Sequence, residues 1–267
     1  MNLTLHGRTL DQLAIETLRT FEPPEGYWLA DSGGKDSSVL LDLAQRSGVR
    51  FEANYSVTPV DPPEIHRFLR TQHPGTAWIH PRYSAIQLAA HNAMLPTMRI
   101  RWCCREWKER GGTGRTVLTG IRAAESPRRR RRSQVETCIR KPGTHYVHPI
   151  LDWTNADVWQ YITERSIPTC SLYAEGYKRI GCVLCPMTRD TLRQTSRWPR
   201  IALLWRRMAQ AAWQARHDAN PAAENFPTPA AYFTWWLDRD APAPRQETPL
   251  FPYQETPLSA ACPEATP

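Results

Sequence analysis

The sequence predicts an α/β fold in which a mostly parallel sheet is covered by helices on both faces. Two observations lead to this prediction. Up to about residue 190, short apolar segments bounded by turn residues alternate with segments of helical periodicity, which is the order expected of a parallel sheet with helical crossovers. A glycine-rich turn also joins the first apolar segment to the helical pattern that follows it.

The elements of this sheet domain follow in order along residues 1–190. Residues 1–21 alternate polar and apolar side chains at helical spacing and predict an amphipathic helix. The expected strands are 26–30, 50–57, 76–80, 115–120 and 146–150. The further expected helices are 37–48, 62–72 and 155–162. Pro62 and Pro63 suit the start of the second of these helices, and Thr154 with Asp157 predicts a capping box for the third.

The composition changes twice towards the C-terminus. Residues 191–238 predict a helical extension, with one long helix over 191–219 in which tryptophans pack a core rather than stack on bases. Residues 239–267 are rich in proline without apolar periodicity, so we expect an extended, disordered tail. The predicted domains are therefore 1–190, 191–238 and 239–267.

Composition also restricts the class of protein. The chain of 267 residues contains 41% hydrophobic and 22% charged residues, and no apolar run approaches the roughly 20 residues that cross a bilayer. Residues 1–21 lack the charged start and continuous apolar centre of a signal peptide. We therefore expect a cytoplasmic protein with no membrane partner.

Residues 32–38, Ser-Gly-Gly-Lys-Asp-Ser-Ser, form a candidate phosphate-binding loop. Glycines allow a sharp turn that brings backbone N–H groups close to an anion, and the start of the next helix adds unpaired N–H groups and a positive dipole end. The spacing differs from that of a Walker loop. On its own the segment also fits a simple strand-to-helix turn in which Ser37 or Ser38 caps the helix.

The same string directly after a strand resembles the pyrophosphate loop of the adenine nucleotide alpha hydrolase superfamily. This resemblance implies a Rossmann-like, doubly wound sheet with an adenine nucleotide at the carboxyl ends of its strands. It also implies that the residues of the loop bind that nucleotide, namely Ser32, Gly33, Gly34, Lys35, Asp36, Ser37 and Ser38.

Three further segments in matching order extend the resemblance to the phosphoadenosine phosphosulfate reductase family, over about residues 25–190. These segments are 54–69, 119–126 and 148–162. The second is similar to the family signature Gly-x-Arg-x-x-Glu-Ser, which implies that Gly120, Arg122 and Ser126 contact the nucleotide. Arg122 would donate to phosphate or sulfate oxygens, and Glu125 would orient it. The alternative is an exposed Arg122 paired with Glu125 near a helix start.

Five of the seven cysteines lie in segments with metal-like spacing, namely Cys103, Cys104, Cys170, Cys182 and Cys185. A Cys-x-x-Cys pair lets two thiolates reach one metal, and a distant tandem pair supplies the other ligands. Zinc suits four cysteines as well as an iron–sulfur cluster does. The arrangement resembles the set that holds a [4Fe–4S] cluster in adenosine phosphosulfate reductases, with Cys104 and Cys170 competing for one place.

The reaction stays open between two enzymatic alternatives. Reductases of the family attack sulfate with a cysteine in a C-terminal Glu-Cys-Gly-Leu-His segment, and the C-terminal cysteine of this chain, Cys262, lacks those neighbours. The intact loop instead favours ATP cleaved to AMP and pyrophosphate in sulfur transfer or nucleic-acid modification. The residues expected to act in catalysis are Lys35, Asp36, Arg122 and Glu125. Mg²⁺ would neutralise the pyrophosphate, with Asp36 as a candidate ligand. The alternative is a sulfonucleotide reductase that forms sulfite.

The arginine run and the family resemblance also suggest which macromolecules the protein binds. The formal charge of +8 is concentrated in the arginine run 128–132, which is either a solvated basic loop or a docking surface for nucleic acid. A nucleotide-binding module that docks on nucleic acid without catalysis is therefore a further alternative. Sulfur transfer would require a sulfur donor protein, such as a cysteine desulfurase.

Overall fold

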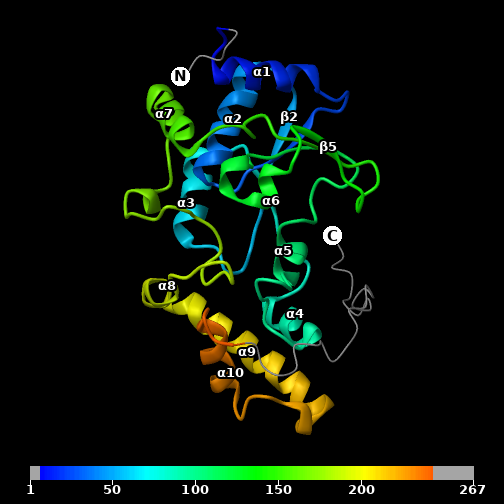
Figure 1. Cartoon of the computed structure of the whole chain (residues 1–267), viewed down its shortest axis with the longest axis vertical. Coiled ribbons are helices and arrows are strands. Elements are labelled where there is room, and N and C mark those ends of the chain that lie inside the picture. The colour runs from blue at the N-terminus through cyan, green and yellow to red at the C-terminus, as the bar shows by residue number, and fades with distance from the viewer. Residues whose placement is uncertain (1–6, 243–267) are drawn as a thin grey trace, which may run out of the picture. The chain divides into compact units, whose positions relative to one another are not determined.

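The computed structural model describes residues 7–242 of the chain (Figure 1). Their contacts divide them into two compact units. The first unit contains residues 7–82 and 101–185, and the second contains residues 83–100 and 186–242. Most of the predicted tail, including Cys262, lies outside the described residues, as do residues 1–6.

A six-stranded sheet in the order β3-β2-β1-β4-β6-β5 forms the centre of the first unit. Its strands are β1 (Tyr27–Ala30), β2 (Phe51–Ser56), β3 (Ala77–Ile79), β4 (Thr116–Leu118), β5 (Val135–Thr137) and β6 (His145–Val147). Every pairing is parallel except that of β5 with β6. The predicted α/β class and mostly parallel sheet are confirmed, and β5 is an addition that the sequence analysis did not predict.

The predicted helices of the first unit are also present. The helices of this unit are α1 (Leu10–Thr20), α2 (Lys35–Ser47), α3 (Pro63–Gln72), α5 (Trp102–Trp107), α6 (Pro127–Arg130) and α7 (Asn155–Arg165), with 3₁₀ turns η1 (Ala123–Glu125) and η2 (Ser171–Tyr173). The capping box of α7 is confirmed, because the Asp157 N–H donates to Thr154 Oγ1 at 3.2 Å and the Thr154 N–H donates to Asp157 Oδ2 at 2.7 Å.

The core of the first unit holds the start of α2 in place. Leu18 of α1, Leu29 of β1, and Leu40 and Leu43 of α2 are completely buried in one cluster. Burial of each such side chain stabilises the fold by about 1.5–3 kcal/mol. Because β1 and α2 are both anchored in this cluster, the short connection between them has a defined position at the carboxyl edge of the sheet.

The order in which the chain adds strands reverses between the parallel neighbours β1 and β4. The chain proceeds from β1 to β2 on one side of β1, whereas it proceeds from β4 to β6 on the other side. In a doubly wound sheet this reversal opens a crevice at the carboxyl ends of the two strands, where ligands bind. The segments that follow β1 and β4 meet at these strand ends, since Arg122 Nε donates to Asp36 Oδ1 there.

The second unit is helical. Its helices are α4 (Ala85–Asn92), α8 (Thr191–Arg197), α9 (Pro199–Ala219) and α10 (Pro229–Leu237), with the turn η3 (Pro221–Ala223). Helix α9 packs against α4 and α10, and the rings of Trp205 and Trp236 lie 4.7 Å apart. The Leu95 N–H donates to the hydroxyl of Tyr232 at 2.7 Å. Residues 83–100, which the sequence analysis placed in the first domain, thus pack with the C-terminal helices.

The prediction of one long helix over 191–219 is wrong, because the helix ends at Arg197 and a new one begins at Pro199. Proline lacks an N–H and disfavours the helical conformation of the residue before it, and Trp198 has φ −126° and ψ 66°. The prediction of core tryptophans is confirmed for Trp198 and Trp205, which are buried. Leu192, in contrast, is 85% exposed.

None of the helices within residues 7–242 combines the length and the apolar character needed to cross a lipid bilayer.

Candidate functional site

The connection between β1 and α2 is a tight turn braced by a buried carboxylate. Asp31 is 2% exposed and accepts hydrogen bonds from the Gly33 N–H at 3.0 Å and from Thr76 Oγ1 at 2.9 Å. Gly33 has φ +68°, and a Cβ there would lie 3.1 Å from side-chain atoms of Ile65 and Leu69. The turn therefore requires glycine at this position for both its backbone conformation and its packing.

Asp31 also contacts His73, whose Nδ1 lies 2.7 Å from Asp31 Oδ2. Burial disfavours the charged form of Asp31, but the hydrogen bonds from His73, Gly33 and Thr76 together favour it more and lower the pKa of the carboxyl below its ordinary value. A carboxyl whose pKa is lowered on folding stabilises the fold above its unfolded pKa of about 3.9 and loses this contribution as the pH falls through the folded pKa.

Asp31→Asn is therefore expected to lower the free energy of unfolding at pH 7 by about 1–2 kcal/mol. The difference between wild type and variant should shrink as the pH falls below about 4, because wild type loses the contribution of the ionised carboxyl there. Urea denaturation at a series of pH values measures this difference in the free energy of unfolding. Asp152→Asn, at an exposed position, is the matched control. A difference that stays constant down to pH 3 would show that the charge of Asp31 does not stabilise the fold.

The serine side chains of residues 32–38 form hydrogen bonds with the backbone of the same loop. Helix α2 begins at Lys35 with Gly34 as its N-cap, so the alternative in which Ser37 or Ser38 caps the helix is wrong. Ser37 Oγ accepts from the Ser32 N–H at 3.2 Å and donates to the Gly34 carbonyl at 2.9 Å. Ser38 Oγ donates to the same carbonyl at 3.2 Å. These bonds hold the backbone of the loop in a fixed turn at the helix N-terminus.

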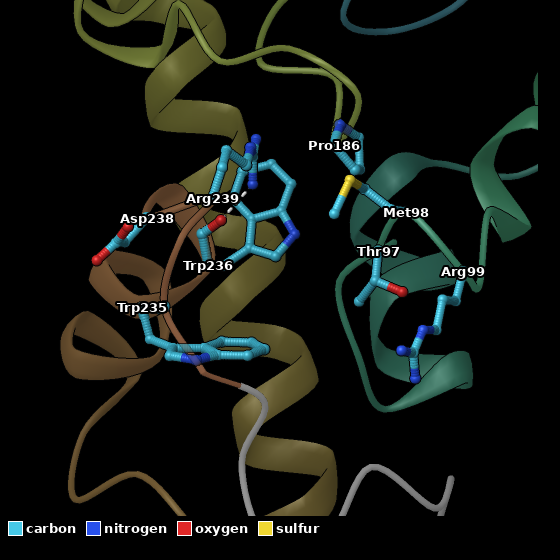
Figure 2. Close-up of a pocket in the computed structure, with 9 residues that line it drawn as sticks. Thr97, Met98, Arg99, Pro186, Trp235, Trp236, Asp238 and Arg239 are labelled. Atoms are coloured by element: carbon cyan, nitrogen blue, oxygen red, sulfur yellow. Dashed lines mark hydrogen bonds between the residues drawn. The ribbon is translucent and has the colours of Figure 1, made fainter. Parts of the chain in front are cut away.

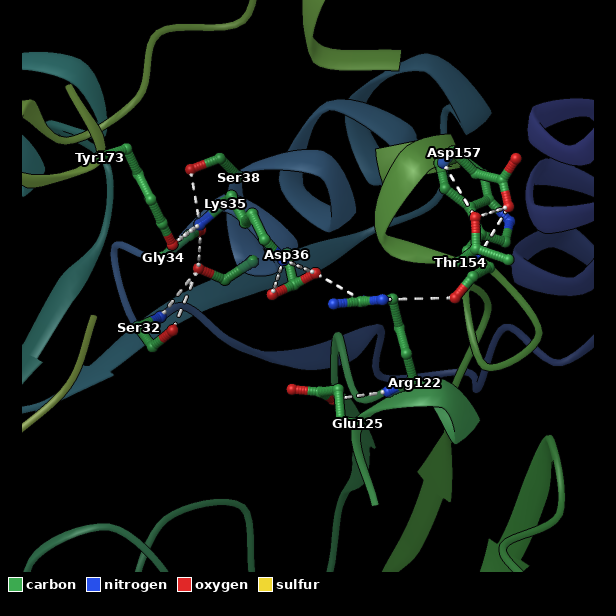
Figure 3. Close-up of polar contacts among 12 residues, drawn as sticks. Ser32, Gly34, Lys35, Asp36, Ser38, Arg122, Glu125, Thr154, Asp157 and Tyr173 are labelled. Atoms are coloured by element: carbon green, nitrogen blue, oxygen red, sulfur yellow. Dashed lines mark hydrogen bonds and ion pairs between the residues drawn. The ribbon is translucent and has the colours of Figure 1, made fainter. Parts of the chain in front are cut away.

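Two buried cations share one carboxylate at the crevice (Figure 3). Lys35 and Arg122 are each 4% exposed. Lys35 Nζ lies 2.8 Å from both carboxylate oxygens of Asp36, and Arg122 Nε lies 2.7 Å from Asp36 Oδ1. Burial lowers the pKa of Lys35, and the contact with Asp36 opposes that shift. Glu125 also acts on Lys35 but is paired with Arg129, so Lys35, Arg122 and Asp36 keep an excess of one positive charge beside the positive end of α2, which favours an added anion.

Arg122 is placed by the turn that follows β4. The backbone N–H of Arg122 donates to Glu125 Oε2 at 2.9 Å, and Nη1 of its guanidinium lies 3.4 Å from the carbonyl oxygen of Trp153. Glu125 forms an ion pair with Arg129, and Ser126 Oγ accepts from the Arg129 N–H at 3.2 Å. The alternative of an exposed Arg122 whose side chain pairs with Glu125 is wrong. Glu125 and Ser126 instead support the turn that directs Arg122 at Asp36.

Gly120 lets this turn approach the start of α2. A Cβ on Gly120 would lie 2.8 Å from the carbonyl oxygen of Asp36 and 3.0 Å from its carbonyl carbon. Both atoms belong to the backbone, which cannot move aside as a flexible side chain can. Glycine at this position is therefore what allows Arg122 to reach Asp36.

Gly120→Ala is expected to destabilise the protein by about 1–3 kcal/mol, because the added methyl group overpacks against the backbone of α2. Thermal unfolding measures the effect. Gly75→Ala is the matched control, since a Cβ there would meet no atom within 4 Å. Equal melting temperatures for the two variants would contradict the close approach of the two segments.

Tyr173 contacts the loop and was missed by the sequence analysis. The Lys35 N–H donates to the hydroxyl of Tyr173 at 2.9 Å, and the Tyr173 ring packs against Trp159 at 5.3 Å. The N–H of Lys35 is one of the first N–H groups of α2, which have no partner within the helix. No local sequence signal could identify this contact, because the two residues are 138 positions apart.

Four of the five candidate cysteines, Cys103, Cys104, Cys182 and Cys185, are linked by their effects on the pKa of Cys103 and Cys104. The thiol of Cys103 donates to Cys104 and lowers the pKa of Cys104, and Arg101 and Lys108 lower it further. The hydrogen bond with Cys104 and burial raise the pKa of Cys103, and ionised Cys182 and Cys185 raise it further. Cys182 also lies 3.5 Å from Thr58 Oγ1. The groups that act on Cys170 are instead Glu64 and Glu175, after the effect of burial, which raises its pKa.

The chemistry of this donor set fits a group held by four thiolates, with cations beside it that would offset negative charge. Within residues 7–242, however, no group of three or more His, Cys, Asp and Glu side chains is arranged so that it could hold a metal ion. The four thiols are Cys103, Cys104, Cys182 and Cys185. Cys170 instead begins the segment that carries Tyr173 to the phosphate loop, since the Tyr173 N–H donates to the Cys170 carbonyl at 3.1 Å.

The arginine run lies directly after the turn of Arg122. Arg129 pairs with Glu125, and Arg132 lies 2.6 Å from Glu136. Arg128, Arg130 and Arg131 are exposed and form no ion pair within the described part of the chain. Three of the five arginines are therefore available to a polyanion.

The second unit has a hollow of its own, of about 240 Å³ (Figure 2). Its aromatic wall is formed by Trp235 and Trp236, and the Arg239 guanidinium lies 4.4 Å from the centre of the Trp236 ring. The Trp236 ring N–H donates to the carbonyl of Pro96 at 2.7 Å. None of the residues that the sequence analysis selected lines this hollow.

The reversal of strand order between β1 and β4 and the glycine-rich turn at residues 32–38 together define a nucleotide-binding domain with an adenine nucleotide alpha hydrolase-like fold. The family model of the phosphoadenosine phosphosulfate reductase domain matches residues 26–188. The chain belongs to this family, which confirms the resemblance that the motifs predicted.

Proteins similar to this chain include two sequence relatives and one solved structure. A phosphoadenosine 5′-phosphosulfate reductase of Xylella fastidiosa is 27% identical over 181 residues, which cover 59% of this chain and 71% of that protein. An uncharacterised 37.8 kDa protein of Escherichia phage 186 is 30% identical over 145 residues, or 47% of this chain, and the chain spans only 43% of its length. The crystal structure of a phosphoadenylyl-sulfate reductase from Candida auris gives a TM-score of 0.48 at 22% identity, over 68% of this chain and 97% of that one.

Proposed function

We propose that the first unit binds ATP at residues 32–38 and cleaves it between the α and β phosphates. The observation that carries this proposal is the pair of buried cations, Lys35 and Arg122, that share Asp36 at the crevice of the sheet. A pyrophosphate group brings several negative charges to a site with an excess of positive charge at a helix N-terminus. The loop, the crevice and the charge excess coincide at one place, which supports a nucleotide with a β,γ-pyrophosphate.

In the proposed reaction an oxygen nucleophile of the acceptor attacks the α phosphorus. The bond from the α phosphorus to the bridging oxygen breaks, and pyrophosphate leaves with the electron pair, so that the acceptor carries AMP. Lys35 and Arg122 would neutralise the charge that develops on the leaving group. Asp36 would hold Mg²⁺, for which its carboxylate is a suitable ligand, while Glu125 keeps the turn of Arg122 in place.

The second part of the proposal is a role in sulfur transfer or nucleic-acid modification with a [4Fe–4S] cluster on the thiols of Cys103, Cys104, Cys182 and Cys185. Such a cluster supplies electron transfer when it is bound. Zinc is the alternative occupant of the same donor set. In this role a sulfur donor protein, such as a cysteine desulfurase, would deliver the sulfur that displaces AMP from the acceptor.

Incubation with ATP and Mg²⁺ tests the reaction. Without an acceptor, water takes the place of the oxygen nucleophile, so we expect free AMP and pyrophosphate in equal amounts, and formation of ADP and orthophosphate would overturn the proposal. Protein purified without oxygen tests the metal site separately. Iron, sulfide and a visible charge-transfer absorbance are expected, whereas zinc without this absorbance would exclude the cluster.

A second candidate function is reduction of a sulfonucleotide to sulfite. Family membership and the similarity to the Xylella enzyme favour it. Release of sulfite from phosphoadenosine phosphosulfate with a thiol reductant and without ATP would support this function. Failure to release sulfite while pyrophosphate is formed from ATP would exclude it.

A further inference from the structure

One face of α3 carries a hollow that is separate from the phosphate loop. Its volume is about 360 Å³, and it is lined by Pro63, His66, Arg67, Arg70 and Thr71. Residues at these spacings share one face of a helix. The opposite face of α3 is buried, since it carries Ile65, Phe68 and Leu69. We call the lined face the α3 groove.

Aromatic side chains of the sheet support the α3 groove. The ring of His66 lies 5.8 Å from that of Tyr55 on β2 and 5.4 Å from that of Trp78 on β3, both in edge-to-face contacts. The guanidinium of Arg70 lies 4.9 Å from the centre of the Trp78 ring. This cation–π contact holds the guanidinium of Arg70 over the edge strand of the sheet, and the residue stays exposed.

The two arginines of the α3 groove have no acidic partner in the described part of the chain. Arg67 and Arg70 are exposed and form no ion pair with any residue that the structure describes. His80 adds a further basic group close to His66. Asp61, the acid that acts on His66, accepts hydrogen bonds from Tyr55 and from the Thr58 N–H.

His66 also carries an unused hydrogen-bonding atom. Its Nε2 is buried and has no partner within residues 7–242. A buried polar atom without a partner is destabilising unless a ligand or water satisfies it. Two free guanidinium groups and one unsatisfied ring nitrogen therefore belong to a single helix face.

We propose that the α3 groove binds a phosphate group of a nucleic-acid strand, with Arg67 and Arg70 donating to its oxygens and His66 completing the contact. Guanidinium groups match phosphate oxygens in charge and geometry. An open groove on a basic chain suits the repeated phosphates of a backbone. A free phosphate ester offers the same oxygens, and the experiment below separates the two sources. The proposal concerns binding alone and does not depend on ATP cleavage.

The test uses the full chain and a fluorescent single-stranded oligonucleotide, with binding followed by anisotropy between about 50 and 200 mM salt. Arg67→Gln and Arg70→Gln should each weaken binding about tenfold and reduce the slope of log K against log salt by about 0.7. His66→Phe keeps the ring packing and should also weaken binding. Arg50→Gln is the matched control, because it removes one exposed charge at the opposite end of β2 and should leave binding unchanged.

A second arm titrates inorganic phosphate and AMP and follows the ring signals of His66 by NMR. Signals that move in wild type and not in the arginine variants, with unchanged oligonucleotide binding, would support the groove with a free phosphate ester as its ligand. If oligonucleotide binding is lost only on replacing Arg128, Arg130 and Arg131, and phosphate leaves the His66 signals unmoved, the α3 groove is not a phosphate site. If wild type, Arg67→Gln and Arg70→Gln bind the oligonucleotide, inorganic phosphate and AMP equally well, the proposal is overturned.

Discussion

Asp36→Ala is expected to lower the free energy of unfolding by about 3 kcal/mol, because removing one partner of a buried ion pair leaves the other charge uncompensated. Here two buried cations, Lys35 and Arg122, lose the carboxylate that both contact. Urea denaturation at pH 7 measures the loss. Asp152→Ala is the control for the removal of an exposed carboxylate, and we expect its effect to stay within about 0.5 kcal/mol.

The same variant should respond more strongly than wild type to an added anion. Pyrophosphate can take the place of the missing carboxylate beside Lys35 and Arg122, and a ligand that binds only the folded state raises the melting temperature. We therefore expect pyrophosphate to raise the melting temperature of Asp36→Ala by more than that of wild type. An equal shift in both proteins would show that pyrophosphate does not bind at these two cations.

Lys35→Met is expected to lower the rate of pyrophosphate release from ATP by about 10²–10³-fold, since it removes one donor aimed at the charge of the leaving group. Methionine keeps much of the length and apolar volume of the lysine stem, so the fold should persist. Steady-state measurement of pyrophosphate release with ATP and Mg²⁺ provides the comparison.

Lys178→Met is the matched control, because Lys178 is exposed and lies outside the phosphate loop. It should retain the rate of wild type. If Lys35→Met retains that rate as well, Lys35 does not stabilise the leaving group, and the proposed role of the buried cation pair is wrong. Retained binding of ATP with a reduced rate would instead assign Lys35 to the chemical step.

Local sequence patterns predict much of the fold. Segments such as Tyr27–Ala30 and Lys35–Ser47 carry their own signals, because apolar periodicity and turn residues are properties of neighbouring positions. The capping box of Thr154 and Asp157 likewise needs only four consecutive residues. The prediction of a long helix over 191–219 is wrong because it gives apolar periodicity more weight than the break at Pro199, a signal that is equally local.

Contacts between distant positions could not be predicted in this way. The pairing of Arg122 with Asp36 spans 86 positions, and that of Tyr173 with Lys35 spans 138. The spacing of the cysteines likewise did not show that Cys182 Sγ lies 3.5 Å from Thr58 Oγ1, 124 positions away. Strand β5 has three residues and pairs with the edge of the sheet, so its own sequence carries little signal.

The sequence by itself determined the α/β class, the glycine-rich turn at residues 32–38 and the motifs of the family, because each depends on residue types at short, fixed spacings. Only the tertiary structure decided that Lys35 and Arg122 share Asp36, that Gly120 permits this approach, and that residues 83–100 pack with the C-terminal helices. The physical reason is that burial and charge compensation depend on which segments the sheet order brings together. That order is set by the packing of the whole core rather than by any one segment.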